Sequence, residues 1–210
     1  MSIKEIIYDW GGLNTQLFYL INNIQSALYH KFMVLGTMLG ETKIFPVYIL
    51  LILGFAYYAL KRRKNLQATD YPEYRERWLK AITVITIGFF MDVLWVWYLK
   101  GYLEMPRPFI ALPVGTVTQL VNESPFSSFP SGHSCFAMLL AAGLWPMLGK
   151  IGKTIAVFYV VWVAFSRLAV GVHFPADVVG TLLLSFLVVC IVRLLVNRIY
   201  LFWSKHRLTK

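Results

Sequence analysis

Long apolar runs recur along the chain and are separated by short polar or charged connections. A helix needs about 20 mostly apolar residues to cross a bilayer. Five runs approach that length: Ile44 to Leu60, Ala81 to Leu99, Ser131 to Leu148, Thr154 to Val170 and Ala176 to Val192. The pattern therefore predicts an all-α fold, a polytopic transmembrane helix bundle with five clear spans.

The stretch from Leu13 to Leu39 is apolar as well, but it is interrupted by Asn14, Gln16, Asn22, Asn23, Gln25, His30 and Lys31. Such a segment can lie in the membrane interface or form another crossing helix. We expect a sixth span here, which would place both termini in the cytoplasm.

Composition supports a membrane protein, because 58% of the 210 residues are hydrophobic and 14% are charged. We expect residues 1–210 to form one integral membrane domain. Glu5 and Asp9 interrupt the basic-then-apolar pattern of a cleaved signal, so no removed leader is expected. Cys135 and Cys190 lie in apolar runs and predict no disulfide.

The net charge of +10 does not indicate a nucleic-acid partner, since the basic residues flank the apolar spans. They gather in residues 61–80, at Lys150 and Lys153, and in the tail after Arg193. Short cytoplasmic loops carry such an excess of Lys and Arg. The opposite, cation-poor ends of the spans are therefore expected to face outward, toward the periplasm or exterior of a bacterial cytoplasmic membrane.

Three polar blocks fall at these outward ends. They are Lys100 with Arg107 and Pro108 (KxxxxxxRP), residues 130–133 (PSGH), and Ser166 and Arg167 followed by His173 and Asp177 (SRxxxxxHxxxD). Because each block begins or ends a predicted span on the same side, the three should converge at one membrane surface.

The cations and the start of the third span predict a phosphate site. Lys100, Arg107 and Arg167 supply strong donors, and an Arg fork matches phosphate oxygens in two-point fashion. Ser131 and Gly132 lie at a helix start, where free N–H groups and the helix dipole favour an anion.

The histidines predict phosphoryl transfer. Pro175 suits a first helical turn, which would place Asp177 where it can accept a hydrogen bond from His173. The other ring nitrogen would then attack phosphorus and form a phosphohistidine. His133 is the expected acid for the departing oxygen and the later base for water.

The three blocks together resemble the signature of the type 2 phosphatidic acid phosphatase superfamily. The resemblance covers Lys100 to Asp177 and leaves residues 1–43 and the tail untested. It implies that His173 is the nucleophile, Asp177 its partner and His133 the acid. It also implies that phosphate is bound by Lys100, Arg107, Ser131, Gly132 and Arg167.

We therefore expect a membrane enzyme that hydrolyses a lipid phosphate or diphosphate at the outer face. An isoprenoid carrier diphosphate such as undecaprenyl diphosphate is slightly favoured over phosphatidylglycerol phosphate, phosphatidate or lipid A phosphates. Phosphate transfer to an acceptor lipid would use the same residues. A transporter would instead place polar groups at mid-membrane, where only Asp92 lies.

No metal or cofactor is expected, because Asp177 is the one carboxylate of the three blocks and is assigned to His173. Three fixed cations would supply the charge that a metal ion supplies elsewhere. Glu104 and Glu123 are the outward loop carboxylates and are candidates for tuning head-group choice.

Overall fold

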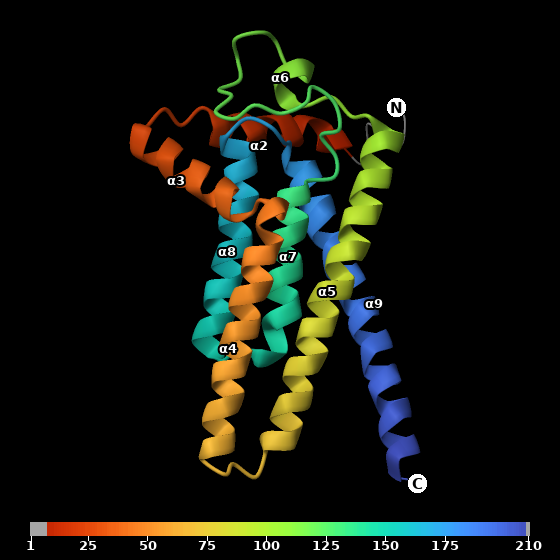
Figure 1. Cartoon of the computed structure of the whole chain (residues 1–210). Helices are drawn as coiled ribbons and strands as arrows, with labels where there is room; N and C mark the ends of the chain where they lie inside the picture. The colour runs from red at the N-terminus through yellow and green to blue at the C-terminus, as the bar shows by residue number, and fades with distance from the viewer. Residues whose placement is uncertain (1–7, 209–210) are drawn as a thin grey trace.

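The computed structural model describes the backbone of residues 8–208 and the side chains of residues 8–203. It is an all-α bundle whose long helices run roughly side by side, and the connection formed by residues 104–131 lies at one end (Figure 1). The long helices are α4 (Phe45–Asn65), α5 (Tyr71–Leu103), α8 (Lys150–Ala169) and α9 (Pro175–Leu208).

These four helices contain the segments that are long and apolar enough to cross a membrane within the described residues: Thr42–Asn65, Tyr71–Leu103, Lys150–Ala169 and Pro175–Trp203. The first includes the short 3-10 helix η2 (Thr42–Ile44). Helix α5 has 33 residues, or about 50 Å at the standard helical rise, so it extends beyond a hydrocarbon core of about 30 Å. Four of the five expected spans are therefore confirmed as helices of sufficient length.

The third expected span, Ser131 to Leu148, is different. It divides into the 13-residue α7 (Gly132–Leu144) and the 3-10 helix η3 (Trp145–Met147). Pro146 lies inside η3, where it cannot continue the α-helical hydrogen bonding. Helix α7 packs against α5, α8 and α9 and is largely buried. Its apolar run reflects a central position in the protein more than contact with lipid.

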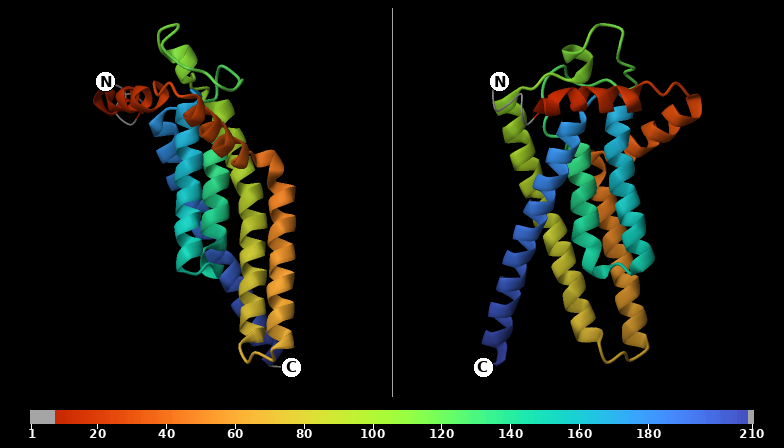
Figure 2. Two further views of the ribbon diagram at one scale, coloured as in Figure 1. Left: turned by 90° about the vertical axis from the view of Figure 1, so that its left-hand side faces the viewer. Right: turned by 180° about the vertical axis from the view of Figure 1, so that it is seen from behind.

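The expected sixth span is wrong. Residues 13–39 form α2 (Leu13–Asn22) and α3 (Ala27–Leu39), each too short to cross. Helix α2 lies across the site end of the bundle, and α3 descends obliquely from it (Figures 1 and 2). Asn14 and Asn22, which interrupt the apolar pattern, are both buried. The beginning and the end of the described chain consequently lie at opposite ends of the bundle.

The polar contacts of these asparagines explain the position of α2. Asn14 accepts a hydrogen bond from the backbone N–H of Ala176, at 2.9 Å. Asn22 donates to the carbonyl of Ala169 and accepts from the N–H of Thr118. An apolar helix that satisfies buried backbone groups of other segments is stabilised where it lies, across the bundle instead of through the bilayer.

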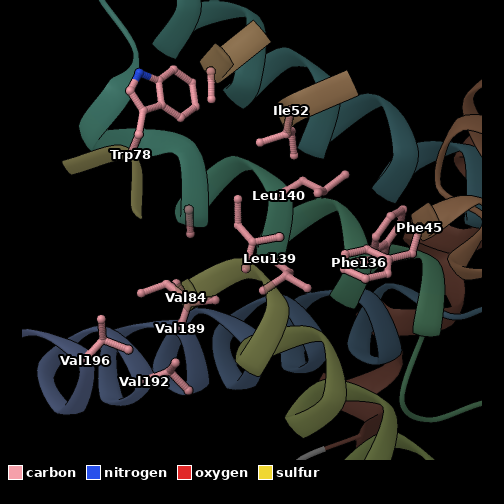
Figure 3. Close-up of a cluster of buried hydrophobic side chains, with 13 residues drawn as sticks. Phe45, Ile52, Trp78, Val84, Phe136, Leu139, Leu140, Val189, Val192 and Val196 are labelled. Atoms are coloured by element: carbon pink, nitrogen blue, oxygen red, sulfur yellow. The ribbon is translucent and has the colours of Figure 1, made fainter. Parts of the chain in front are cut away.

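The main apolar core fills the space between α4, α5, α7 and α9 (Figure 3). Phe45 stacks on Phe89, with ring centroids 3.8 Å apart, and both rings meet Phe136 edge-on. Outward faces of the same helices carry exposed side chains such as Leu50 and Leu194, as expected for surfaces in contact with lipid.

Two glycines allow α5 and α7 to approach closely. A Cβ atom on Gly88 would lie 2.6 Å from Leu139 Cδ1, and one on Gly143 would lie 2.4 Å from Ile85 Cγ1. Small residues at helix contacts are the usual way in which membrane helices pack tightly. The contact fixes the position of α7, whose first residues belong to the candidate site.

We predict that Gly143→Leu destabilises the protein by about 1 to 3 kcal/mol, because the added side chain overpacks this contact. The measurement is the thermal unfolding temperature in detergent. Gly54→Leu on α4 is the matched control, since nothing lies within 4 Å of a Cβ at that position. Equal unfolding temperatures for the two variants would contradict the close-packing argument.

Candidate active site

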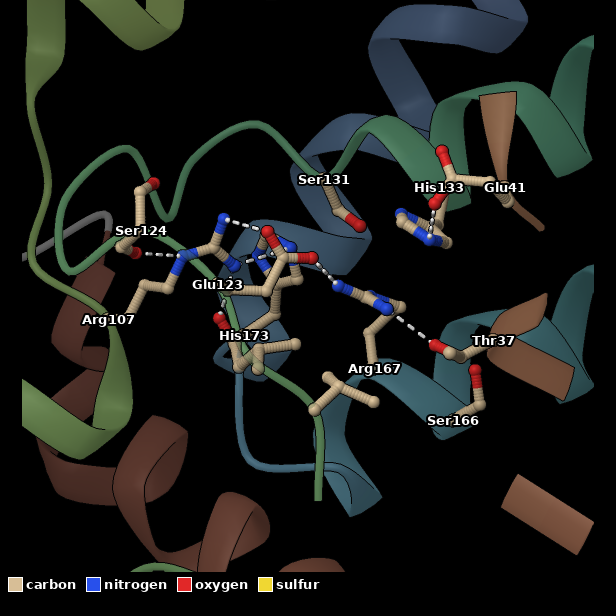
Figure 4. A network of polar contacts seen from close by, with 12 residues as sticks. Thr37, Glu41, Arg107, Glu123, Ser124, Ser131, His133, Ser166, Arg167 and His173 are labelled. Carbon is tan, nitrogen blue, oxygen red and sulfur yellow. Dashed lines mark hydrogen bonds and ion pairs between the residues drawn. The ribbon is translucent and has the colours of Figure 1, made fainter. Parts of the chain in front are cut away.

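The structure brings the three sequence blocks together at one end of the bundle. Lys100 lies in the last turn of α5, and Arg107 immediately precedes the short helix α6 (Pro108–Ala111). Helix α7 begins at the PSGH block, Arg167 lies near the end of α8, and His173 and Asp177 flank the start of α9. Segments far apart in the sequence thus supply one polar cluster (Figure 4).

The turn from α8 to α9 depends on a glycine. Gly171 has a φ of +80°, and a Cβ atom there would lie 2.4 Å from the carbonyl oxygen of Thr118. Only glycine adopts this backbone without strain, and only glycine leaves room for the α6–α7 connection that passes so near. The turn brings His173 back toward Arg167 and Arg107.

His173 is buried beside a carboxylate and a guanidinium. Its Nδ1 lies 3.4 Å from Asp177 Oδ2, without a hydrogen bond of good geometry, and its Nε2 lies 3.2 Å from Arg107 Nη1. Catalytic contacts are often long in a site without substrate. Burial lowers the pKa of His173 well below its usual range, and the nearby Arg167 and Arg107 lower it further. A neutral ring has a lone pair to offer as a nucleophile.

Three hydrogen-bond donors other than His173 contact the Asp177 carboxylate. Ser128 Oγ and the backbone N–H of Phe174 donate to Oδ2, at 2.6 and 2.8 Å, and the Tyr8 hydroxyl donates to Oδ1 at 2.7 Å. Burial and the adjacent Asp177 raise the pKa of Tyr8, so its hydroxyl stays protonated as a donor. These contacts fix the carboxylate against His173.

Two guanidiniums form the centre of the cation cluster. Arg107 and Arg167 are only 2% and 1% exposed. Arg107 donates to the carbonyls of Ser124 and Val172, and Arg167 donates to the Thr37 hydroxyl. Lys100 Nζ donates to the carbonyl of Ser127 at 3.1 Å. Lys100 and Arg107 line the same cavity as His173, and Arg167 lies close enough to His173 to lower its pKa.

Glu123 lies between the two guanidiniums. Its Oε1 is 2.7 Å from Arg167 Nη2, and its Oε2 is 3.3 Å from Arg107 Nη2. The sequence had suggested Glu123 only as one of two outward loop carboxylates. The structure shows it as the counterion of the arginines.

His133 lies at the opening of the cluster, on the first turn of α7. Its Nε2 is 3.6 Å from Glu41 Oε2. Burial lowers the pKa of His133, and Arg167 adds to the effect. An arriving phosphate would counter the nearby positive charge and favour the protonated ring that an acid requires.

Ser131, expected to bind phosphate, makes its hydrogen bonds within the protein. It is the N-cap of α7, its Oγ accepts from Ser134, and its own N–H donates to Thr181 Oγ1 at 2.8 Å. That N–H is thus engaged by the protein. Gly132 lies at the lining of the cavity, and no neighbouring atom lies within 4 Å of a Cβ built on it.

A cavity of about 310 Å³ connects the cluster to the apolar interior. Its polar end is lined by Lys100, Arg107, Gly132, His133 and His173, together with Glu123. It continues between α5 and α7 along Phe89, Val93, Val96, Phe136 and Leu139. Asp92 also lines it and is held by Trp95 and Ser185. A charged end joined to an apolar channel suits a molecule with an anionic head and a hydrocarbon tail.

Comparison with known proteins is decisive for the family. Residues 77–200, more than half of the chain, match the PAP2 superfamily, and this region contains all eight candidate site residues. The chain belongs to the PAP2 superfamily. Together with its four candidate spans, this membership makes it an integral membrane protein.

Among curated proteins, an undecaprenyl-diphosphatase of Bacillus subtilis is 36% identical over 41% of this chain and 42% of its own length. A phosphatidylglycerophosphatase B of the same species is 37% identical over 55% of this chain and 59% of its own length. The alignments thus span about half the length of these relatives.

The crystal structure of a PAP2-type phosphatidylglycerolphosphate phosphatase from Bacillus subtilis resembles the whole bundle. Its TM-score is 0.69 at 25% identity, and the superposition covers 91% of this chain and 88% of that one. The PAP2 transmembrane fold therefore extends over most of the chain, beyond the three blocks.

Several contacts of this PAP2 site were not expected from the sequence. Tyr8 and Thr37 lie in the N-terminal region that the signature does not cover, and Glu41 and Ser128 belong to no recognised block. No spacing rule indicates them, because each is placed by tertiary packing. Within the described residues, no group of three or more His, Cys, Asp and Glu side chains is arranged to hold a metal ion.

We predict that Tyr8→Phe lowers kcat about tenfold, because Asp177 loses one of its charge-assisted hydrogen bonds. The measurement is steady-state phosphate release in detergent. Tyr102→Phe is the matched control at the same end of the bundle, since Tyr102 is 73% exposed. Equal kcat values for the two variants would show that Tyr8 does not act through Asp177.

Proposed function

We propose that the protein is a lipid phosphatase that hydrolyses a lipid phosphate or diphosphate through a phosphohistidine intermediate at the outer face of the membrane. The observation that carries this proposal is the position of His173. Its Nε2 lies beside Arg107, its Nδ1 faces Asp177, and it lines the cavity that continues into the apolar interior.

In the first step, His173 Nε2 forms a bond to phosphorus while the bond from phosphorus to the lipid-side oxygen breaks. His133, protonated when the anionic head group is bound, gives its proton to the departing oxygen. Asp177 stabilises the positive charge that develops on the His173 ring. Lys100, Arg107 and Arg167 hold the equatorial oxygens, whose charge is spread in the transition state.

In the second step, water attacks phosphorus and the phosphorus–nitrogen bond breaks. His133 takes the proton of the attacking water, and His173 recovers its lone pair as inorganic phosphate forms. Each group thus returns to its starting protonation state when the phosphate leaves. The chain needs no other reactant than water and the lipid.

The substrate that we propose is an isoprenoid carrier diphosphate such as undecaprenyl diphosphate. Its support is the similarity to an undecaprenyl-diphosphatase, together with a cavity whose apolar lining comes from α5 and α7. Phosphatidylglycerol phosphate is the comparison substrate, because the other relatives act on it by name.

The orientation that we propose puts the site on the periplasmic or exterior side of a bacterial cytoplasmic membrane. Support comes from the distribution of cations over the bundle. Residues 61–80 and the end of α9 lie at the end opposite the site (Figure 1). A Lys- and Arg-rich end is retained in the cytoplasm.

The test of the chemistry is phosphate release by the purified protein from undecaprenyl diphosphate, phosphatidylglycerol phosphate and phosphatidate. We expect release from at least one of these, and a loss of at least about a thousandfold in His173→Ala, because no other group can replace the nucleophile. His30→Ala on α3 is the matched control. Release by His173→Ala at the rate of this control would refute the mechanism.

The test of orientation is the labelling of single cysteines in intact cells with a thiol reagent that does not cross membranes. We expect Val114→Cys, in the fully exposed connection at the site end, to react. Arg62→Cys, at the opposite end, should react only after the cells are permeabilised. The parent chain, with Cys135 and Cys190, gives the background. The reverse pattern would place the site in the cytoplasm.

A further inference from the structure

The carboxylate of Glu123 occupies the place in the cation cluster where an anion would be expected. Arg107 Nη2 and Arg167 Nη2 both point at it, and each of its oxygens pairs with one guanidinium (Figure 4). Glu123 is 28% exposed in its side chain, whereas the two arginines are almost fully buried. It therefore approaches the arginines from the open side of the cavity.

A phosphoryl group and this carboxylate need the same donors. Nη1 of Arg107 already donates to the carbonyl of Val172, and its Nε donates to that of Ser124. Nη1 of Arg167 donates to Thr37. The donors that remain for an incoming anion are the two Nη2 groups, which Glu123 holds, and the Nε of Arg167, which has no partner among the described residues. Two anions cannot share these donors without strong repulsion in a buried site.

Glu123 lies outside the helices, on the irregular connection between α6 and α7. Lys100, His133 and Arg167 project from α5, α7 and α8. Asn122 and Ser124, which flank Glu123, are exposed. A side chain on such a connection can move without disturbing the packed helices.

We propose that Glu123 is an internal competitor for the phosphate site, and so a residue that sets substrate and product affinity. It neutralises Arg107 and Arg167 while the site is empty, leaves their Nη2 groups when the lipid phosphate binds, and returns as inorganic phosphate departs. The inference rests on the proposed function, because it takes the two arginines to be the phosphate-binding groups.

The competing account is that Glu123 only positions the arginines. The two accounts predict opposite changes when the charge is removed. Loss of a competitor makes inorganic phosphate bind more tightly, whereas loss of a positioning residue makes it bind more weakly. The inhibition constant of phosphate therefore distinguishes them.

The experiment compares wild type, Glu123→Gln and the control Glu104→Gln, because the Glu104 carboxylate is exposed at the same end of the bundle but, unlike Glu123, does not line the cavity. The inhibition constants of inorganic phosphate and of vanadate are measured together with KM and kcat. For Glu123→Gln we expect both inhibition constants to fall about tenfold and KM to fall as well, because the ion pairs of Glu123 with Arg107 and Arg167 no longer have to break. Glu104→Gln should match wild type.

Thermal unfolding in detergent gives a second measurement that does not depend on turnover. Without phosphate, Glu123→Gln should unfold at a lower temperature than wild type, because two buried guanidiniums lose their counterion. Added inorganic phosphate should raise the unfolding temperature of Glu123→Gln by more than that of wild type. An equal or smaller rise in the variant would overturn the proposal.

These measurements distinguish a failure of the competitor role of Glu123 from a failure of the proposed function. If wild type releases phosphate but Glu123→Gln has an unchanged or higher inhibition constant for phosphate, Glu123 is not a competitor and the proposed function stands. If wild type releases no phosphate from any lipid tested and is not stabilised by phosphate or vanadate, the proposed function and this inference are both overturned.

Discussion

The structure depends on the burial of positive charge at one end of a membrane bundle. Arg107 and Arg167 are almost inaccessible to solvent, and an unpaired buried charge costs several kcal/mol even after the protein relaxes. Most of their donors pair with groups from the connection between α6 and α7, from α3 and from the turn before α9, while the Nε of Arg167 has no partner among the described residues. The hydrogen bonds of the two arginines thus connect segments that are far apart in the sequence.

The helices supply the rigid frame that this arrangement needs. Helix α7 is short and central, and it contacts α5, α8 and α9 at once. Gly88 and Gly143 let α7 lie close to α5, which fixes the position of α7 in the bundle. Glu123 lies on the irregular connection between α6 and α7, so the site combines buried guanidiniums with a partly exposed carboxylate.

The sequence predicted the parts of the fold and site that follow local rules. Apolar runs of crossing length identified α4, α5, α8 and α9, and the fixed spacing of the three blocks identified the residues that meet at the site. The length of the apolar run wrongly predicted one crossing helix from Ser131 to Leu148, because a helix surrounded by protein is as apolar as one surrounded by lipid. It failed for residues 13–39 because Asn14 and Asn22 form hydrogen bonds with distant backbone groups. The partners of Asp177 and Arg167 in the N-terminal region depend on the same tertiary contacts and have no sequence signature.

The path of the first described residues has a practical consequence for handling the protein. Tyr8 donates a hydrogen bond to the Asp177 carboxylate, and Asn14 accepts one from the first turn of α9, whereas the end of α9 lies at the far side of the bundle (Figure 2). An affinity tag or a fluorescent fusion joined ahead of Tyr8 would be attached next to the residue that holds Asp177 in place. The carboxyl terminus is the end at which foreign sequence can be attached without touching the reaction centre.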